Sequence, residues 1–164
     1  MSALIQKIEA QQILDSRGNP TVEAKVFLSD GNVGIASVPS GASTGDKEAI
    51  ELRDTQSPSW CNKGVSLAVQ NIEKIIAPEL YNHSPFNIKK IDQTMIDLDG
   101  THNKSKLGAN AILAVSLATL KSAAKSQKIS LFNYVSNIYL EQKNIHKDIK
   151  EYLMPVPMMN ILNG

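Results

Sequence analysis

The 164-residue sequence has one cysteine, few aromatic residues, almost no net charge and no long apolar run. Cys61 has no second cysteine with which to form an internal disulfide, which is usual for proteins of a reducing cytoplasm. A formal net charge of +1 does not favour binding to nucleic acid or to an anionic membrane surface. No apolar stretch approaches the roughly 20 residues of a membrane-spanning helix. These shortages argue against disulfide-stapled, strongly basic and membrane-spanning classes of protein.

The residues that are present predict a globular chain that begins with three antiparallel strands. Hydrophobic residues make up 42% and charged residues 20% of the chain, enough for one domain with a core. From Thr21 to Leu28 apolar side chains alternate with others, the period of a half-covered strand. Strands are also expected over Ile5 to Leu14 and Asn32 to Val38, and Asp30-Gly31 between the last two is a hairpin signal.

Helical spacing replaces this alternation farther along the chain. After Gly64 apolar residues recur every three or four positions, and we expect this amphipathic helix to end at Pro78. A short helix is expected from Lys47 to Asp54. Further helices are expected over residues 88–98, 109–125 and 131–140. The order of elements predicts an α+β fold, a three-stranded meander followed by helices.

The last segment is almost uniformly apolar, from Leu153 to Leu162. Such a run is typical of a strand covered on both faces, as in a parallel sheet or barrel. Because one buried strand cannot exist alone, we expect the sequence to stop at the start of a second domain. The predicted organisation is a first domain over residues 1–145, then a linker and the first strand of a truncated α/β barrel over residues 146–164.

A loop of small residues follows the third predicted strand. Pro39 ends that strand, and Gly41 and Gly45 enclose Ser43 and Thr44. Hydroxyl groups are neutral oxygen ligands of the kind that Mg²⁺ accepts, and glycine lets the main chain approach a ligand closely. A surface turn rich in small residues is the alternative interpretation.

The same loop matches the G-x-S-x-G pattern of a serine hydrolase. The match covers Gly41-Ala42-Ser43-Thr44-Gly45, and three histidines lie downstream, at positions 83, 102 and 146. In those hydrolases the pattern joins a parallel strand to a helix. Here an antiparallel meander precedes it, so the pattern alone is a weak indication of a hydrolase.

Five segments of the sequence together resemble the enolase family, in that family's order and along nearly the whole chain. They are LDSRGNPTVE (residues 14–23), PSGASTG (39–45), EA with ELRD (48–54), DLDGT with NKSKLGANAIL (97–113) and MPVPMMNILNG (154–164). The last of these is closer to the bacterial members.

The resemblance implies a fold and a reaction. Enolases have an N-terminal α+β domain packed across the mouth of a modified α/β barrel. They use Mg²⁺ to dehydrate 2-phosphoglycerate to phosphoenolpyruvate in glycolysis and gluconeogenesis, in the cytoplasm. The lysine base, the glutamate acid and the main metal carboxylates of the family lie beyond the position of Gly164. No catalytic residue is therefore expected in this chain, and the 164 residues alone are expected to be inactive.

The resemblance also assigns roles to residues of this chain. It implies that Ser43 binds the second Mg²⁺ when an active-site lid closes on substrate. The rest of that lid would be Ser40, Gly41, Ala42, Thr44 and Gly45. Glu23 would contact the other subunit of a homodimer or higher oligomer, although Gln11 stands where most relatives have an arginine that helps to pair the subunits. A stand-alone domain that binds a partner without catalysis is the alternative function.

Overall fold

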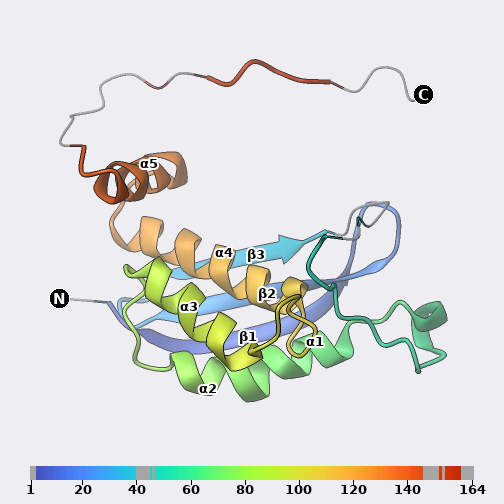
Figure 1. Ribbon diagram of the computed structural model, residues 1–164. Coiled ribbons are helices and arrows are strands. Elements are labelled where there is room, and N and C mark those ends of the chain that lie inside the picture. The colour runs from blue at the N-terminus through green and yellow to red at the C-terminus, as the bar shows by residue number, and fades with distance from the viewer. Residues whose placement is uncertain (1–2, 40–44, 46, 146–151, 153, 160–164) are drawn as a thin grey trace. The chain divides into compact units, whose positions relative to one another are not determined.

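The computed structural model describes residues 3–39, 45, 47–145, 152 and 154–159. The chain forms two compact units, Met1–Leu131 and Phe132–Gly164. The first contains a three-stranded sheet and the helices that cover one of its faces (Figure 1). The second contains α5 and the C-terminal segment. This order of a meander followed by helices confirms the predicted α+β fold.

The sheet has the strand order β1-β2-β3, and both pairs are antiparallel. Its strands are β1 (Ile5–Leu14), β2 (Pro20–Leu28) and β3 (Val33–Val38). The alternation in β2 has the predicted effect, because Val22, Ala24 and Val26 are fully buried beneath the helices. Gly31 adopts a positive φ of 84° in the turn between β2 and β3, a conformation that glycine permits.

The helix expected to end at Pro78 continues past it. It runs through α1 (Ser66–Asn71), the π-helical turn η2 (Ile72–Ile76) and α2 (Ala77–Leu80). A proline lacks the N–H that a regular helix uses and its ring meets the carbonyl four residues earlier. Here the wider π-helical turn precedes Pro78, and the proline lies in the first turn of α2, where its missing N–H is tolerated. The prediction that Pro78 terminates the helix was wrong.

The short helix expected from Lys47 to Asp54 does not form either. The segment is irregular, and its backbone bonds to a distant part of the chain. Ile50 N donates to Asn103 O at 2.8 Å, and Ala109 N donates to Ile50 O at 2.8 Å. These long-range bonds take up backbone groups that a helix would pair locally.

The remaining helices agree with the predicted ranges to within about two residues. They are α3 (Ile88–Asp99), α4 (Ala109–Ser126) and α5 (Leu131–Gln142), and a short 3₁₀ turn, η1 (Ser59–Asn62), precedes α1. α4 packs on β2 and β3, whereas α1, η2 and α2 lie along β1 (Figure 1). Buried side chains of the sheet and of these helices form one hydrophobic core.

The second unit contains α5 and the described part of the apolar C-terminal segment. Phe132 and Tyr152 make an edge-to-face ring contact with centroids 4.9 Å apart. Residues 154–159 form no strand, and Met158 is 96% exposed. A strand buried on both faces needs neighbours on either side, and the described part of this unit provides none. Leu153 and residues 160–164 lie outside the described residues.

Candidate functional site

The loop that carries the predicted site follows β3. Ser40, Gly41, Ala42, Ser43 and Thr44 lie outside the described residues, so both the metal and the hydrolase interpretation of Ser43 stay predictions. Gly45 is described, and its carbonyl accepts a hydrogen bond from Glu48 N at 3.0 Å. The structure therefore describes the frame that holds the two flanks of the loop.

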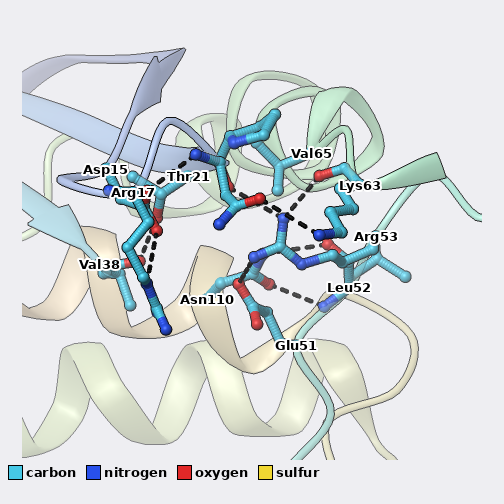
Figure 2. A network of polar contacts seen from close by, with 12 residues as sticks. Asp15, Arg17, Thr21, Val38, Glu51, Leu52, Arg53, Lys63, Val65 and Asn110 are labelled. Atoms are coloured by element: carbon cyan, nitrogen blue, oxygen red, sulfur yellow. Dashed lines mark hydrogen bonds and ion pairs between the residues drawn. The ribbon is translucent and has the colours of Figure 1, made fainter. Parts of the chain in front are cut away.

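The flank before the loop is tied to the middle strand of the sheet. Val38, the last residue of β3, pairs with Val22 of β2. The Val38 carbonyl also accepts a hydrogen bond from Thr21 Oγ1 (Figure 2). Thr21 is buried, so this hydroxyl is held in place by its surroundings. The chain consequently leaves the sheet from a fixed point.

The flank after the loop is tied to the start of α4. Asn110 Oδ1 accepts from Leu52 N, and Asn110 Nδ2 donates to Leu52 O, both at 3.1 Å (Figure 2). The side-chain amide thus pairs with both backbone groups of Leu52, as a neighbouring strand would. Asn110 is 3% exposed, so this pairing is shielded from water.

Arg53 connects this second flank to the turn between β1 and β2. Its Nη1 donates to Pro20 O at 2.9 Å and to Lys63 O at 2.6 Å, and its Nη2 bonds Glu51 Oε1 at 2.6 Å (Figure 2). A planar guanidinium can hold several acceptors at once in fixed directions. One side chain therefore ties its own segment to Pro20, 33 positions away, and to Lys63, 10 positions away.

The turn that Arg53 reaches is itself held by a carboxylate. Asp15 Oδ1 accepts from the backbone N–H groups of Arg17 and Asn19, each at 2.8 Å. The hydrogen bond from Asn19 is the main reason that the pKa of Asp15 lies below its usual value, with smaller contributions from Arg17 and Arg53. Gly18 has φ of 74° in this turn, which allows the chain to reverse tightly.

Asp54 joins the frame to the N-terminus of α1. Its carboxylate accepts from Ser66 N at 2.9 Å, from Leu67 N at 3.0 Å and from the Ser66 hydroxyl. Burial acts to raise the pKa of Asp54, but the hydrogen bonds from Ser66 and Leu67 outweigh it and lower the pKa below its usual value. A Cβ at Gly64 would lie 2.5 Å from Asp54 Oδ2, so the close approach requires glycine there.

This arrangement can position a loop, but its described residues do not form a metal site. Among residues 3–39, 45, 47–145, 152 and 154–159, no three His, Cys, Asp or Glu side chains gather as metal ligands. Oδ1 of Asp15 and both carboxylate oxygens of Asp54 instead accept hydrogen bonds from N–H donors of the frame. The described residues do not fit a Mg²⁺ ion by themselves, and Ser43 could supply only one of the several oxygens that it requires.

Of the three histidines of the hydrolase interpretation, His83 and His102 are described, and they lie in different parts of the first unit. His83 follows α2, and its carbonyl accepts from Ile5 N at 2.9 Å. His102 is exposed in the loop after α3, and His146 lies outside the described residues. Arg53 and Asn110 were not singled out for a role by sequence reasoning. The scarcity of arginine, with only Arg17 and Arg53 in the chain, was the one available signal for Arg53.

Glu23, the predicted subunit contact, lies on the face of the sheet opposite the helices. Gln11 Nε2 donates to Glu23 Oε1 at 2.8 Å, and Ser37 Oγ donates to Glu23 Oε2 at 3.0 Å. The three residues are register partners across β1, β2 and β3. Beside them is a pocket of about 240 Å³ lined by Glu9, Ala10, Gln11, Glu23, Lys25 and Glu73. Glu23 is thus presented on the sheet surface by neighbours of its own chain.

No helix among the described residues has both the length and the apolar character needed to cross a membrane.

Comparison with known proteins places this architecture in one family. A family model described as the N-terminal domain of enolase matches residues 5–135. The enolase of Anaplasma phagocytophilum (strain HZ) is 52% identical over 162 residues, which cover 99% of this chain and 35% of that protein. The enolase of Mycoplasma genitalium (strain ATCC 33530 / DSM 19775 / NCTC 10195 / G37) is 52% identical over 164 residues, which cover 100% of this chain and 35% of that protein. The chain thus spans about a third of the length of these relatives, and it belongs to the enolase N-terminal domain family.

Proposed function

We propose that this chain is the N-terminal part of an enolase that dehydrates 2-phosphoglycerate to phosphoenolpyruvate in glycolysis and gluconeogenesis. The observation that carries the proposal is the 52% identity to enolases along essentially the whole chain. Residues 1–145 are the proposed N-terminal domain, and residues 146–164 the linker and first strand of the barrel. The proposed enzyme works in the cytoplasm.

The frame described above would hold both ends of the proposed lid. Thr21 fixes the point where the chain enters residues 40–45, and Arg53 and Asn110 fix the segment that follows them. We propose that residues 40–45 close over the substrate from these fixed flanks, which would limit the entropy lost on closure. We propose that the lid comprises Ser40, Gly41, Ala42, Ser43, Thr44 and Gly45.

Ser43 is the proposed metal ligand of this lid. Mg²⁺, when bound, would offset the negative charge that develops as a proton leaves the substrate carbon. The chain's own part is to bring one neutral oxygen, the Ser43 hydroxyl, toward that charge and to exclude water. The base, the acid and the carboxylates that hold the metal are proposed to come from the part of the enzyme beyond Gly164.

Ser43→Ala in the full-length enzyme tests this assignment. Losing one oxygen ligand is expected to raise the Mg²⁺ concentration for half-maximal activity by about tenfold, or ~1.4 kcal/mol. Activity should recover partly at high Mg²⁺, because the remaining ligands are intact. Ser105→Ala, in the exposed loop between α3 and α4, is the matched control. An unchanged Mg²⁺ dependence in Ser43→Ala would remove Ser43 from the metal site.

We also propose that the full-length enzyme is a homodimer and that Glu23 contacts the other subunit. Support comes from the placement of Glu23 on the open face of the sheet, where Gln11 and Ser37 hold its two oxygens. The pocket that Glu23 lines has three carboxylates (Glu9, Glu23 and Glu73) against one lysine (Lys25), and this excess of negative charge would suit a cationic side chain of a partner. Glu23→Gln should weaken the dimer measured by sedimentation equilibrium, and an unchanged dissociation constant would contradict this role.

A further inference from the structure

The outer edge of β3 is the feature that the proposed function does not use. β3 ends the strand order β1-β2-β3, so one of its sides has no strand neighbour among the described residues. Such an edge presents backbone N–H and C=O groups to any extended chain that approaches. Ile35 lies in the middle of β3 and is 43% exposed on the open face of the sheet, so apolar surface adjoins this edge.

Two lysines of α4 occupy the carbonyls of this edge. Lys121 Nζ donates to Ile35 O at 3.0 Å, and Lys125 Nζ donates to Val33 O at 2.7 Å. The spacing of the two lysines along α4 matches the spacing of the two carbonyls along β3. Four helical residues rise about 6 Å and two strand residues about 6.6 Å, so lysines one turn apart reach alternate carbonyls.

Close packing of α4 on β3 makes this reach possible. A Cβ at Gly34 would lie 1.9 Å from Ala118 O and 2.5 Å from Ser122 N, so only glycine permits the observed approach. One residue beyond Lys125, the Ser126 hydroxyl bonds Asp30 in the turn before β3. The lysine stems therefore start close enough to fold over the edge of the strand.

We infer that Lys121 and Lys125 close the β3 edge against the same edge of a second copy of this chain. A second copy is the fitting partner, because two antiparallel β3 edges related by a two-fold axis present identical, self-complementary groups. With the lysines in place, the carbonyls that a second β3 edge would bind are already occupied. The two lysine charges of each copy would also repel the two of the other. Without them, the six-residue strand is free to pair. This inference is independent of the proposed function.

The decisive variant replaces both lysines by methionine, which keeps the length of the side chain and removes its charge and donor. Lys121→Met/Lys125→Met is expected to self-associate at least tenfold more tightly than the parent chain in sedimentation equilibrium. In the associated form, the amides of Val33, Ile35 and Ser37 should exchange with solvent more slowly than in the parent. Lys121→Arg/Lys125→Arg keeps charge and donors and should behave as the parent does.

A matched control distinguishes pairing at the β3 edge from nonspecific association caused by the loss of charge. Lys74→Met/Lys89→Met removes the same charge from exposed positions on η2 and α3 and should leave association unchanged. Parent-like association or exchange in the Lys121→Met/Lys125→Met variant would overturn the inference. Equal association in the control, or association without slower exchange at residues 33, 35 and 37, would also overturn it. If the double variant fails to fold, Lys125→Met alone is judged by the same measurements.

Discussion

Asp54 and Asp92 are two aspartates of the first unit whose pKa values are shifted in opposite directions. Asp54 receives three hydrogen bonds from Ser66 and Leu67, and its pKa is lowered although burial acts to raise it. Asp92, on α3, has a buried Oδ1 without a hydrogen-bond partner. Burial raises the pKa of Asp92, and a hydrogen bond from Ser116 only partly opposes it. The number of donors, not burial alone, decides whether the ionised form is stabilised.

Asp54→Ala is expected to lower the free energy of unfolding at pH 7 by about 0.5–2 kcal/mol, as for the loss of a helix cap. Because the folded pKa is lowered, the stabilisation is present above the pKa of the unfolded chain. It is lost as pH falls through the folded pKa. Urea unfolding at several pH values should therefore show a difference between parent and variant that shrinks in acid. Glu79→Ala, exposed on α2, is the control, and a difference independent of pH would contradict the assignment.

Asp92→Asn is expected to have the opposite effect. The raised folded pKa means that the parent chain loses stability as pH rises through that value. Removing the charge should raise the free energy of unfolding at pH 7 by about 1 kcal/mol or less, since Asp92 is only partly buried. At low pH, where both side chains are neutral, the two proteins should converge. A variant less stable than the parent at pH 7 would show that the Asp92 carboxylate is stabilising.

At the scale of elements, the sequence predicts best where a pattern repeats. The alternation of β2 and the apolar stripes of α3 and α4 are set by which face each element buries, and they were located to within about two residues. The prediction of a helix over residues 47–54 was wrong because the backbone of Ile50 in this segment bonds to Asn103 and Ala109. No local pattern reports partners so distant. The prediction at Pro78 was wrong for a different, local reason, because a π-helical turn precedes the proline and accommodates it.

The frame of the candidate site was the least predictable part from sequence. Arg53 reaches Pro20 across 33 positions, and Asn110 reaches Leu52 across 58. Which acceptor a side chain finds depends on how the elements pack, and a single sequence does not encode this locally. The loop itself stood out because glycines and hydroxyl residues are concentrated at residues 40–45.

Gly34→Ala tests the packing of α4 on β3. The new Cβ would collide with the Ala118 carbonyl at 1.9 Å, and backbone on both elements would have to move. The free energy of unfolding is expected to fall by about 1–3 kcal/mol or more, as overpacking usually costs. Ser37→Ala, on the opposite face of β3, should cost much less. Thermal unfolding of the two variants gives the comparison, and equal loss would show that α4 can shift without cost.

At the scale of the whole molecule, the chain covers 35% of the length of the enolases that it resembles. Its first unit has a core and a frame for residues 40–45, but among the described residues no three His, Cys, Asp or Glu side chains gather to hold a metal ion. In the second unit, Met154, Val156 and Met158 are more than four-fifths exposed. Exposed apolar segments of this kind suit a surface that another part of a protein covers.

The most direct test of the central claim is the conversion of 2-phosphoglycerate by a chimaeric enolase. In it, this chain replaces the matched 164-residue segment of the Mycoplasma genitalium enolase. We expect the purified chimaera to form phosphoenolpyruvate in the presence of Mg²⁺. The 164-residue chain alone, freed of host enolase, should form none, because catalysis by groups that act together is lost when most are removed. A folded but inactive chimaera, or activity of the 164 residues alone that Ser43→Ala reduces, would contradict the account.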